Sequence, residues 1–328
     1  MDNDKILVTG GAGYIGSHVC KALKQQGYTP VVYDNLCSGN VSAIKWGPFE
    51  EGDIRDRNRL SQVIETHKPQ AIMHFAALIQ VAESVVEPSL YYNNNVYGSF
   101  CLLEEAKKHN IKHMVFSSTA AVYGYPDTFP IPENLPKAPI NTYGQTKLMM
   151  EQMIQDYSSA YGLSHAILRY FNAAGADPDC EAGTAYKKDT HIIPLLMNVA
   201  SNLMPAIKIF GTDYNTPDGT AIRDYLHVSD LADVHILALK HILSGKGNLT
   251  LNVGTNQGLS VKEVVEIARS ITGHPIPANL ADRRVGDPPV LIADATQARE
   301  ILQWNPVHSS PETIIKTAWA WKQKQISQ

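Results

Sequence analysis

Tyr143 and Lys147 are the residues whose spacing most directly suggests chemistry. Of the 15 tyrosines in the sequence, only Tyr143 is followed by a lysine four residues later. Side chains at this spacing lie on one side of a helix. A free phenol has a pKa near 10 and is a poor base at neutral pH, but a neighbouring ammonium favours the phenolate. The pair predicts a phenol that removes a proton from a substrate hydroxyl, helped by Lys147, which could also bind a nicotinamide ribose.

A glycine-rich segment near the start of the sequence has the spacing of a dinucleotide-binding turn. Gly10, Gly13 and Gly16 follow the apolar run Ile6 to Thr9 and open a segment of helical period, Ile15 to Gln26, with Tyr14 and Ile15 inside the turn. Glycine allows backbone N–H groups to approach a pyrophosphate, and the helix N-terminus favours its negative charge. A glycine-rich turn without a ligand is the alternative.

Acidic residues after the second expected strand bear on which dinucleotide binds. Asp34 ends that strand about 20 residues after the glycines, where a carboxylate can accept hydrogen bonds from the adenosine ribose. It would repel a 2′-phosphate, so NAD is favoured over NADP. A turn-forming role for Asp34 ahead of Asn35 remains the alternative. Asp53 and Ile54 lie in a loop that could bracket the adenine.

Three hydroxyl residues, Ser117, Ser118 and Thr119, stand at the end of an expected strand at His113 to Ser117. Ligands of doubly wound proteins bind at the carboxyl edge of the sheet. We therefore expect Thr119 or Ser118 to hydrogen-bond a substrate oxygen and relay its proton to Tyr143. Capping of the strand end is the alternative role.

The elements that would position these residues alternate up to about residue 170. Short apolar runs alternate with segments of helical period, which predicts an α/β fold with a doubly wound parallel sheet of the Rossmann type. Asn141 is a plausible N-cap for the helix that carries Tyr143 and Lys147. The expected strands are Ile6 to Thr9, Pro30 to Tyr33, Ala71 to Phe75, His113 to Ser117 and His165 to Arg169, and the expected buried helix face comprises Met150, Met153, Ile154, Tyr157 and Tyr161.

The alternation breaks down after Asn172, which indicates a second, smaller mixed α/β domain. We expect a dinucleotide-binding domain at residues 1–171 and a substrate domain at residues 172–328, with part of the later chain returning to the first domain. Ser260 and Glu263 have the spacing of a helix capping box.

Composition points to small-molecule chemistry. The 328 residues carry a net charge of -4, with 44% apolar and 18% charged residues, so nothing predicts binding to nucleic acid or to a membrane surface. No apolar run approaches the roughly 18 to 20 residues of a membrane-spanning helix. The four dispersed cysteines are typical of reduced thiols, and the cytoplasm is the expected location. The 12 histidines form no ligand-spaced cluster, so no metal site is expected.

The motifs taken together resemble the extended short-chain dehydrogenase/reductase family, and within it the UDP-galactose 4-epimerases. The similarity runs nearly end to end and is far more specific than any single motif. The matching segments are Gly10 to Gly16, His74 to Ala77, Asn93 to Val96, Ser117 to Gly124, Tyr143 to Lys147, Arg169 to Asn172, Phe210 to Tyr214, Arg223 to Asp230 and Arg283 to Asp287.

The resemblance implies a reaction without net redox change. NAD is held through the cycle, Tyr143 takes the proton of the sugar 4-OH as hydride leaves C4, and the 4-keto sugar rotates before the hydride returns. The further cofactor contacts that it implies are Phe75, Ala76, Ala77, Asn95 and Tyr170, and the implied contacts to the UDP-sugar are Asn172, His191, Phe210, Arg223, Arg284 and Asp287. The resemblance also implies a homodimer joined through the helices at Asn95 to Lys108 and Gln145 to Tyr161.

Four positions depart from the family pattern, and they bear on proton relay, cofactor binding and substrate range. Thr119 replaces a frequent serine but keeps the hydroxyl. Ile79 stands where some epimerases have a lysine that contacts the cofactor. Leu291 stands where residue size limits the space beside the sugar C2 substituent, so N-acetylhexosamines remain alternative substrates, and Ala173-Ala174-Gly175 also occurs in relatives that act on UDP-pentoses.

Two other classes of function are weighed against epimerisation. Related dehydratases carry an Asp-Glu pair after the strand-end threonine, where this chain has Ala120 and Ala121. A non-catalytic NAD-sensing protein would be expected to have lost the tyrosine or the lysine, and this chain has both. These residues favour the epimerase interpretation.

Overall fold

The computed structural model describes residues 4–184, 190–284 and 286–327. Strands and helices alternate in its first part. The elements there are β1 (Lys5–Thr9), α1 (Tyr14–Gln25), β2 (Thr29–Asp34), the short turn η1 (Val41–Ala43), β3 (Phe49–Glu51), α2 (Arg57–His67), β4 (Ala71–His74), α3 (Val81–Val86), α4 (Pro88–Tyr91), the π-helical segment η2 (Tyr92–Tyr97), α5 (Gly98–Lys108), β5 (His113–Thr119), η3 (Ala120–Tyr123), α6 (Thr142–Tyr161) and β6 (Ser164–Tyr170).

Shorter strands and more widely spaced helices follow. They are β7 (Asn172–Ala174), α7 (Ile192–Ala200), β8 (Ile207–Phe210), β9 (Ile222–Arg223), β10 (Tyr225–His227), α8 (Val228–Leu243), β11 (Leu249–Val253), β12 (Leu259–Ser260), α9 (Val261–Thr272), β13 (Ala278–Ala281), β14 (Val290–Leu291), α10 (Thr296–Leu302) and α11 (Pro311–Ser327).

The main sheet is parallel and has seven strands in the order β11-β6-β5-β4-β1-β2-β3. This confirms the predicted doubly wound fold. The strand order reverses between β1 and β4, and the carboxyl ends of strands beside such a reversal form the usual ligand crevice. All five expected strands are present, although β4 ends one residue earlier than predicted and β5 runs on through Thr119.

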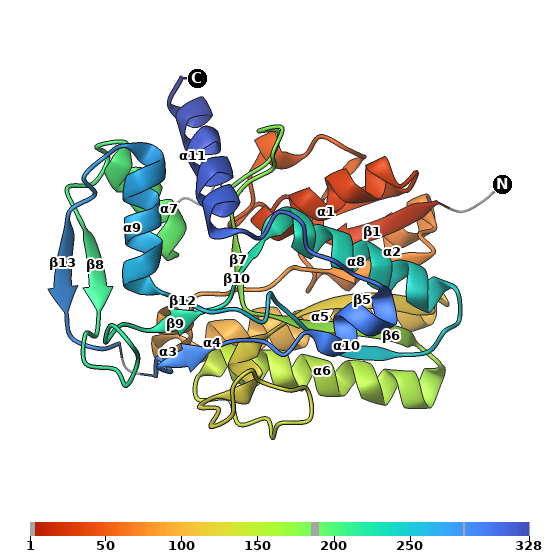
Figure 1. The fold of residues 1–328 in the computed structure, drawn as a ribbon. Helices are drawn as coiled ribbons and strands as arrows, with labels where there is room; N and C mark the ends of the chain where they lie inside the picture. Colours follow the sequence, from red (N-terminus) through yellow and green to blue (C-terminus); the bar gives the residue numbers. More distant parts are fainter. Residues whose placement is uncertain (1–3, 185–189, 285, 328) are drawn as a thin grey trace.

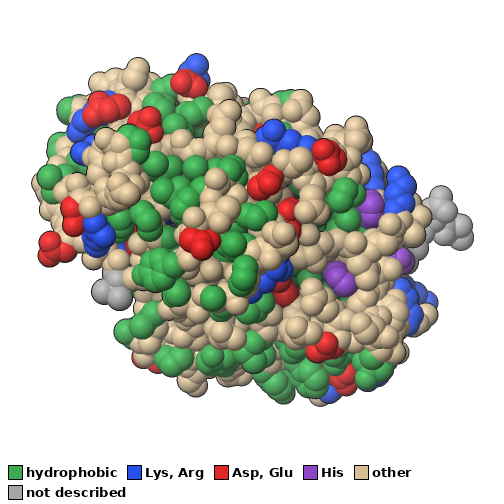
Figure 2. All heavy atoms as spheres, turned by 60° about the horizontal axis from the view of Figure 1, so that its bottom comes forward, with side chains coloured by type: hydrophobic (Ala, Val, Ile, Leu, Met, Phe, Trp, Pro, Cys, Tyr) green, Lys and Arg blue, Asp and Glu red, His purple; other side chains and the backbone are tan. Residues whose placement is uncertain are grey.

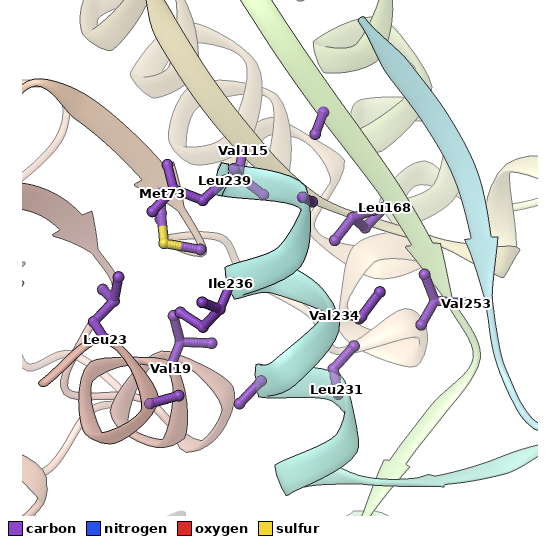
Figure 3. Packing of buried hydrophobic residues seen from close by; sticks show 14 of the residues in the cluster. Val19, Leu23, Met73, Val115, Leu168, Leu231, Val234, Ile236, Leu239 and Val253 are labelled. Atoms are coloured by element: carbon purple, nitrogen blue, oxygen red, sulfur yellow. The ribbon is translucent and has the colours of Figure 1, made fainter. Parts of the chain in front are cut away.

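Helices cover both faces of this sheet (Figure 1). On one face α1 and α8 pack side by side, and on the other lie α2, α5 and α6. Figure 3 shows Val19 and Leu23 of α1 on one side of Ile236 and Leu239 of α8, in one cluster with Met73, Val115 and Leu168 of the strands. Adjacent residues of a strand point to opposite faces, so Ile167 packs in the other cluster. Burial on both faces explains the continuous apolar runs of the strands.

The main sheet and the helices on it take one strand and two helices from the later part of the chain. β11 pairs with β6 at the edge of the sheet, α8 packs on α1, and α10 packs on α8 and β11. The remaining later elements surround a separate apolar cluster that includes Leu196, Ile209, Val265 and Ile315. They form three small sheets with α7, α9 and α11 around them, at the left and top of Figure 1.

Helix termini follow the sequence signals. The Asn141 side chain accepts a hydrogen bond from the Gly144 N–H, which confirms the predicted N-cap of α6. The predicted capping box at Ser260 and Glu263 is also present. The expected buried face of α6 is correct at Met150 and Ile154, but Tyr161 is 46% exposed because the helix ends there.

Charged residues of the loop at residues 177–181 engage a lysine of α1. Asp177, Asp179 and Glu181 all place a carboxylate oxygen within 3.0 Å of the Lys21 ammonium. These three residues are the one group in the described part of the chain whose ligand atoms are close enough for a metal ion. Because the Lys21 ammonium already lies within 3.0 Å of all three carboxylates, we assign no metal to them. Within the described ranges no helix is both long and apolar enough to cross a membrane.

Candidate active site

Tyr143 and Lys147 face the carboxyl end of β5 from the first two turns of α6. The Lys147 ammonium donates a hydrogen bond to the Ser117 carbonyl oxygen at 2.8 Å and lies 4.9 Å from the centre of the Phe116 ring. The Thr119 hydroxyl forms a hydrogen bond with the Tyr143 phenol. The predicted α6 spacing therefore brings the phenol, the ammonium and a strand-end hydroxyl to one place.

The electrostatics of the pair differ from the sequence-based expectation. Burial raises the pKa of Tyr143 to about 12, against a smaller lowering by the Thr119 hydrogen bond. Burial lowers the pKa of Lys147 to about 7, opposed by the negative charge of Glu151. The expected lowering of the phenol pKa by Lys147 is therefore wrong for the protein's own groups, because desolvation dominates and Lys147 is only partly charged near neutral pH.

Ser118 does not point into the site. Its hydroxyl donates to the Glu151 carboxylate beneath the sheet and is buried, whereas the neighbouring Thr119 meets Tyr143. The reason is strand geometry, because β5 continues through Thr119 and successive side chains point to opposite faces. The interpretation of Ser118 as a proton relay is thus wrong, and the relay stays a prediction for Thr119.

A cavity of about 160 Å³ runs from the glycine turn to Tyr143 and Lys147. It lies at the carboxyl ends of β1, β2 and β4, where the sheet order reverses. The predicted cofactor residues that line it are Gly10, Gly13, Tyr14, Ile15, Gly16, Asp34, Asn35, Ile54, Phe75, Ala76, Ala77, Tyr143, Lys147 and Tyr170. The glycine turn and the pair Tyr143 and Lys147, which the sequence predicted from separate motifs, therefore line the same cavity.

Two predicted cofactor residues, Asp53 and Asn95, do not line this cavity. Asp53 forms an ion pair with Arg55 and accepts a hydrogen bond from Asn35 at 2.9 Å, and the pairing with Arg55 lowers its pKa to about 2. The Asn95 amide bonds both backbone groups of Leu78. Their side chains hold residues of the cavity wall, and a direct cofactor contact stays a prediction.

A second cavity, of about 470 Å³, shares Tyr14, Ile15, Ile79, Tyr143 and Tyr170 with the first. Three predicted substrate residues, Thr119, Asn172 and His191, also line it. Tyr143 thus stands where the two cavities meet, as a base acting between a cofactor and a substrate must.

The remaining predicted substrate residues lie on the smaller sheets and in the segment between β13 and β14, and they line neither cavity. Arg223 forms an ion pair with Asp287, and the Arg284 guanidinium lies 4.1 Å from the centre of the Phe210 ring. Leu291 pairs with Arg223 in register on β14 and β9. Val285, within the segment Arg283 to Asp287 that matches the family, lies outside the described residues. These contacts place the Arg284 guanidinium beside an aromatic ring and the Arg223 guanidinium beside a carboxylate, and the fork geometry of both groups suits phosphate oxygens.

Backbone hydrogen bonds tie this group to the centre of the site. The Asn172 N–H donates to the Asp224 carbonyl oxygen, and the Asp224 N–H donates to the Leu291 carbonyl oxygen. The Asp224 side chain is buried and binds Thr255 and Ala293, and burial raises its pKa to about 6. Leu291 is half-buried and packs beside Tyr123 and Ile131.

Comparison with known proteins agrees with this geometry. A family model described as the NAD dependent epimerase/dehydratase family matches residues 6–254. The chain belongs to this family. A "UDP-glucose 4-epimerase" of Rhizobium meliloti (strain 1021) is 48% identical over 325 residues, which cover 99% of each chain.

Solved structures of 4-epimerases are also similar to this chain in fold. A UDP-glucose 4-epimerase from Brucella ovis in complex with NAD is 48% identical, with a TM-score of 0.94 over 97% of this chain and 98% of that one. The UDP-Glc/GlcNAc 4-epimerase from Campylobacter jejuni is 41% identical, with a TM-score of 0.85 over 98% of this chain and 99% of that one.

The residues of this family member fit NAD. Gly10 has a φ of +76°, and an added Cβ would stand 2.6 Å from the Ala76 backbone nitrogen, while a Cβ on Gly16 would stand 2.2 Å from the Gly10 carbonyl oxygen. Larger residues would close the turn that must admit a pyrophosphate. Asp34 lies in the cavity wall and also accepts hydrogen bonds from Ala12 and Leu36, so its turn-forming and ribose-facing roles are compatible.

Several residues of this epimerase/dehydratase site were not predicted. Leu78 and Gln80 line the cofactor cavity and directly follow the matching segment His74 to Ala77, so adjacency could have found them. Glu151 sits one turn after Lys147, a spacing visible in the sequence. The other unpredicted wall residues are Tyr33, Cys37, Ser38, Gly52, Asn94 and Ser117, and the sequence gives no separate signal for Cys37 or Ser38.

Proposed function

We propose that this chain is a UDP-glucose 4-epimerase that interconverts UDP-glucose and UDP-galactose. The observation that carries the proposal is the position of Tyr143 at the junction of the two cavities, beside Lys147 and hydrogen-bonded to Thr119. The relatives named UDP-glucose 4-epimerase along the whole chain support the same reaction.

The residues of the chain have separate tasks in this reaction. NAD, when bound, supplies the hydride acceptor and donor and a positive ring. Tyr143 takes the proton of the sugar 4-OH directly or through Thr119 and later returns it to the 4-oxygen of the rotated sugar. That transfer needs the phenolate, which the protein's own groups oppose, so Tyr143 is a base only beside positive charge.

Substrate binding falls to the residues of the smaller sheets. Arg223 and Arg284 offer their guanidinium donors to the diphosphate, with Phe210 beside the uracil and Asn172 between the two regions. Asp287 fixes Arg223 through their ion pair. Rotation of the 4-keto sugar about its diphosphate link then presents either face to the hydride without release of the nucleotide.

A substrate other than a UDP-hexose is the second candidate. The Campylobacter jejuni relative acts on Glc and GlcNAc sugars according to its name, and Leu291 is smaller than tyrosine. UDP-N-acetylhexosamines and UDP-pentoses are therefore candidates for the same 4-epimerisation. Dehydration is disfavoured because Ala120 and Ala121 carry no carboxylate.

The test is a panel of UDP-hexoses, UDP-pentoses and UDP-N-acetylhexosamines, with the product sugars resolved and with Leu291→Tyr as the paired variant. We expect UDP-galactose and UDP-glucose to interconvert without added oxidant. Leu291→Tyr should lower turnover of N-acetylated sugars more than that of hexoses. Net NADH formation, loss of water, or NAD binding without conversion of any sugar would reject the proposal.

We also propose that two copies associate through the face that carries α6. Figure 2 shows hydrophobic side chains gathered on this side of the molecule. Exposed apolar residues come from α3, η2, α5 and α6, among them Val86, Tyr97, Phe100 and Met149. An apolar surface of this kind marks an interface more often than a solvated face.

The four cysteines are all unpaired, which supports a cytoplasmic location.

A further inference from the structure

Three successive residues at the end of β5 are each held by a residue from α6. Thr119 bonds Tyr143, the Ser117 carbonyl accepts from Lys147, and the Ser118 hydroxyl donates to Glu151. Tyr143, Lys147 and Glu151 are four residues apart, so they occupy successive turns on one side of the helix. The first two contacts belong to the reaction described above, and the third has no role in it.

Glu151 is buried and fully engaged. Its side chain is 2% exposed, and Arg169 binds both carboxylate oxygens, at 2.9 and 2.6 Å. Arg169 also donates to the Tyr123 hydroxyl, which in turn donates to Asn252 of β11. A buried carboxylate is costly unless it is paired, and here its contacts with Ser118 and Arg169 fix α6 to the neighbouring strands β5 and β6.

The charges near Lys147 single out Glu151. The negative charge of Glu151 acts to keep the Lys147 ammonium protonated, against the cost of burial. His74 of β4 is neutral, since burial and the nearby lysine lower its pKa to about 3. The titratable and charged groups facing Lys147 and Glu151 are Tyr143 on α6, His74 on β4, Arg169 on β6, Tyr123 on η3, and Glu133 and Lys137 in the loop before α6.

We propose that Glu151 is a positioning residue of the epimerase reaction, which holds α6 in register on the end of β5 and favours the protonated form of Lys147. The proposal rests on the proposed function, because it assigns Glu151 a task only if the Lys147 ammonium assists Tyr143. Glu151 touches neither cavity and acts through Ser118 and Lys147.

Glu151→Gln tests the charge, because glutamine keeps an oxygen that accepts from Ser118 and loses the negative charge. The Lys147 titration is followed by NMR on protein with ¹³C-labelled lysine side chains, assigned by comparison with Lys147→Met. We expect the Lys147 midpoint to fall by about one pH unit. The alkaline limb of kcat should fall with it, giving about tenfold less activity on that limb, while KM for UDP-galactose changes little.

A second variant keeps the test valid if Glu151→Gln folds poorly with Arg169 left unpaired. Glu151→Leu combined with Arg169→Met removes both charges and replaces the ion pair by apolar side chains of similar size. Because this variant also removes the Arg169 charge, which disfavours the Lys147 ammonium, we expect a downward shift of the Lys147 midpoint that is smaller than that of Glu151→Gln. Ser118→Ala removes the hydrogen bond alone, and it should lower kcat without moving the midpoint.

Glu105→Gln is the matched control. Glu105 of α5 is also a buried glutamate, 3% exposed, and it pairs with Arg57 of α2. Loss of its charge should leave the Lys147 titration unchanged. An unchanged Lys147 midpoint in both Glu151 variants would overturn the inference. A wild-type protein that converts no UDP-sugar would overturn the proposed function instead, so the two failures are distinguishable.

Discussion

Tyr143 is poorly suited to act as a base by itself. At a pKa of about 12 its phenolate is scarce at neutral pH, and Lys147, with a pKa of about 7, supplies only part of a positive charge. The reaction therefore needs charge from the bound cofactor to ionise the phenol. This dependence links proton transfer to the oxidised form of NAD, so the base is active when hydride can be accepted.

Removing the phenol tests this role at the residue scale. Tyr143→Phe should lower kcat by roughly 10²- to 10⁴-fold, because it deletes the acid and base but little of the cavity wall. NAD released on denaturation should stay at the wild-type amount. Tyr125→Phe, at a tyrosine that is 58% exposed, is the control and should keep full activity. A Tyr143→Phe enzyme with near wild-type kcat would remove Tyr143 from the mechanism.

Residue types were easier to predict from the sequence than side-chain directions. The glycines, Asp34, Tyr143 and Lys147 carry their own spacing signals, and all line the expected cavity. Ser118 and Thr119 are chemically alike, and only the extent of β5 decides which one faces Tyr143. The phenol pKa depends on burial by distant segments, which no local pattern reports.

At the element scale, the start of α6 positions the catalytic pair. The Asn141 amide oxygen accepts from Gly144 at 2.8 Å, immediately around Tyr143. Asn141→Ala should destabilise the protein by about 1 kcal/mol in urea unfolding, since one N–H loses its partner. It should also lower kcat, because the first turn carries the base.

The control separates stability from catalysis. Ser260→Ala removes the N-cap of α9, a helix that contributes no predicted site residue, so we expect a similar loss of stability with kcat unchanged. Asn141→Asp keeps the cap and should restore both quantities. Equal kcat in Asn141→Ala and wild type would show that the first turn is held by other contacts.

Strong local periodicity made the five long strands and the helix caps predictable. β3 and β11 were not predicted. β3 is only Phe49–Glu51 and carries two glutamates at the edge of the sheet, so it lacks the apolar run of a buried strand. β11 joins the sheet beside β6, about 80 residues earlier in sequence, and such long-range pairing is decided by packing of α8 rather than by a local pattern.

At the scale of the whole molecule, buried neutral histidines set the acid stability. Burial lowers the pKa of His18 and His235 to about 4, and of His74 and His227 to about 3. Below pH 6.5 these histidines are protonated in the unfolded chain but stay neutral in the folded protein. The free energy of unfolding therefore decreases as the pH falls from 6.5 toward 4. Each histidine contributes up to about 1.4 kcal/mol per pH unit.

Asp224 acts in the opposite direction and does not cancel this effect. Its pKa of about 6 means that the folded protein binds a proton before the unfolded chain does, which adds stability as the pH falls from 6 toward 3.8. Burial also raises the pKa of Asp34, Glu133 and Asp233, so these carboxyls act in the same direction as Asp224, whereas the lowered pKa of Asp53 acts with the histidines. Urea unfolding at fixed protein concentration should show a falling midpoint below pH 6.5. His235→Asn should flatten that fall and His241→Asn should not, whereas a constant midpoint would contradict the buried-histidine account.

Association of two copies is also a property of the whole molecule. Phe100 on α5 and Met149 on α6 are 39% and 37% exposed, so a glutamate at either place would bring charge into the proposed interface. Sedimentation should show a wild-type dimer and a monomer for Phe100→Glu combined with Met149→Glu. Val307→Glu, at a residue that is 68% exposed elsewhere, should stay dimeric. A monomeric wild type would reject the interface.

The most direct test of the account follows the hydrogen at C4 of the sugar. UDP-galactose deuterated at C4 is given to the purified protein without added cofactor, and the UDP-glucose formed is examined by mass and NMR. We predict that the deuterium stays at C4 of the product and that no net NADH accumulates, because hydride leaves and returns within one site. Loss of the deuterium to solvent would contradict hydride return, and with it the role assigned to Tyr143 and NAD.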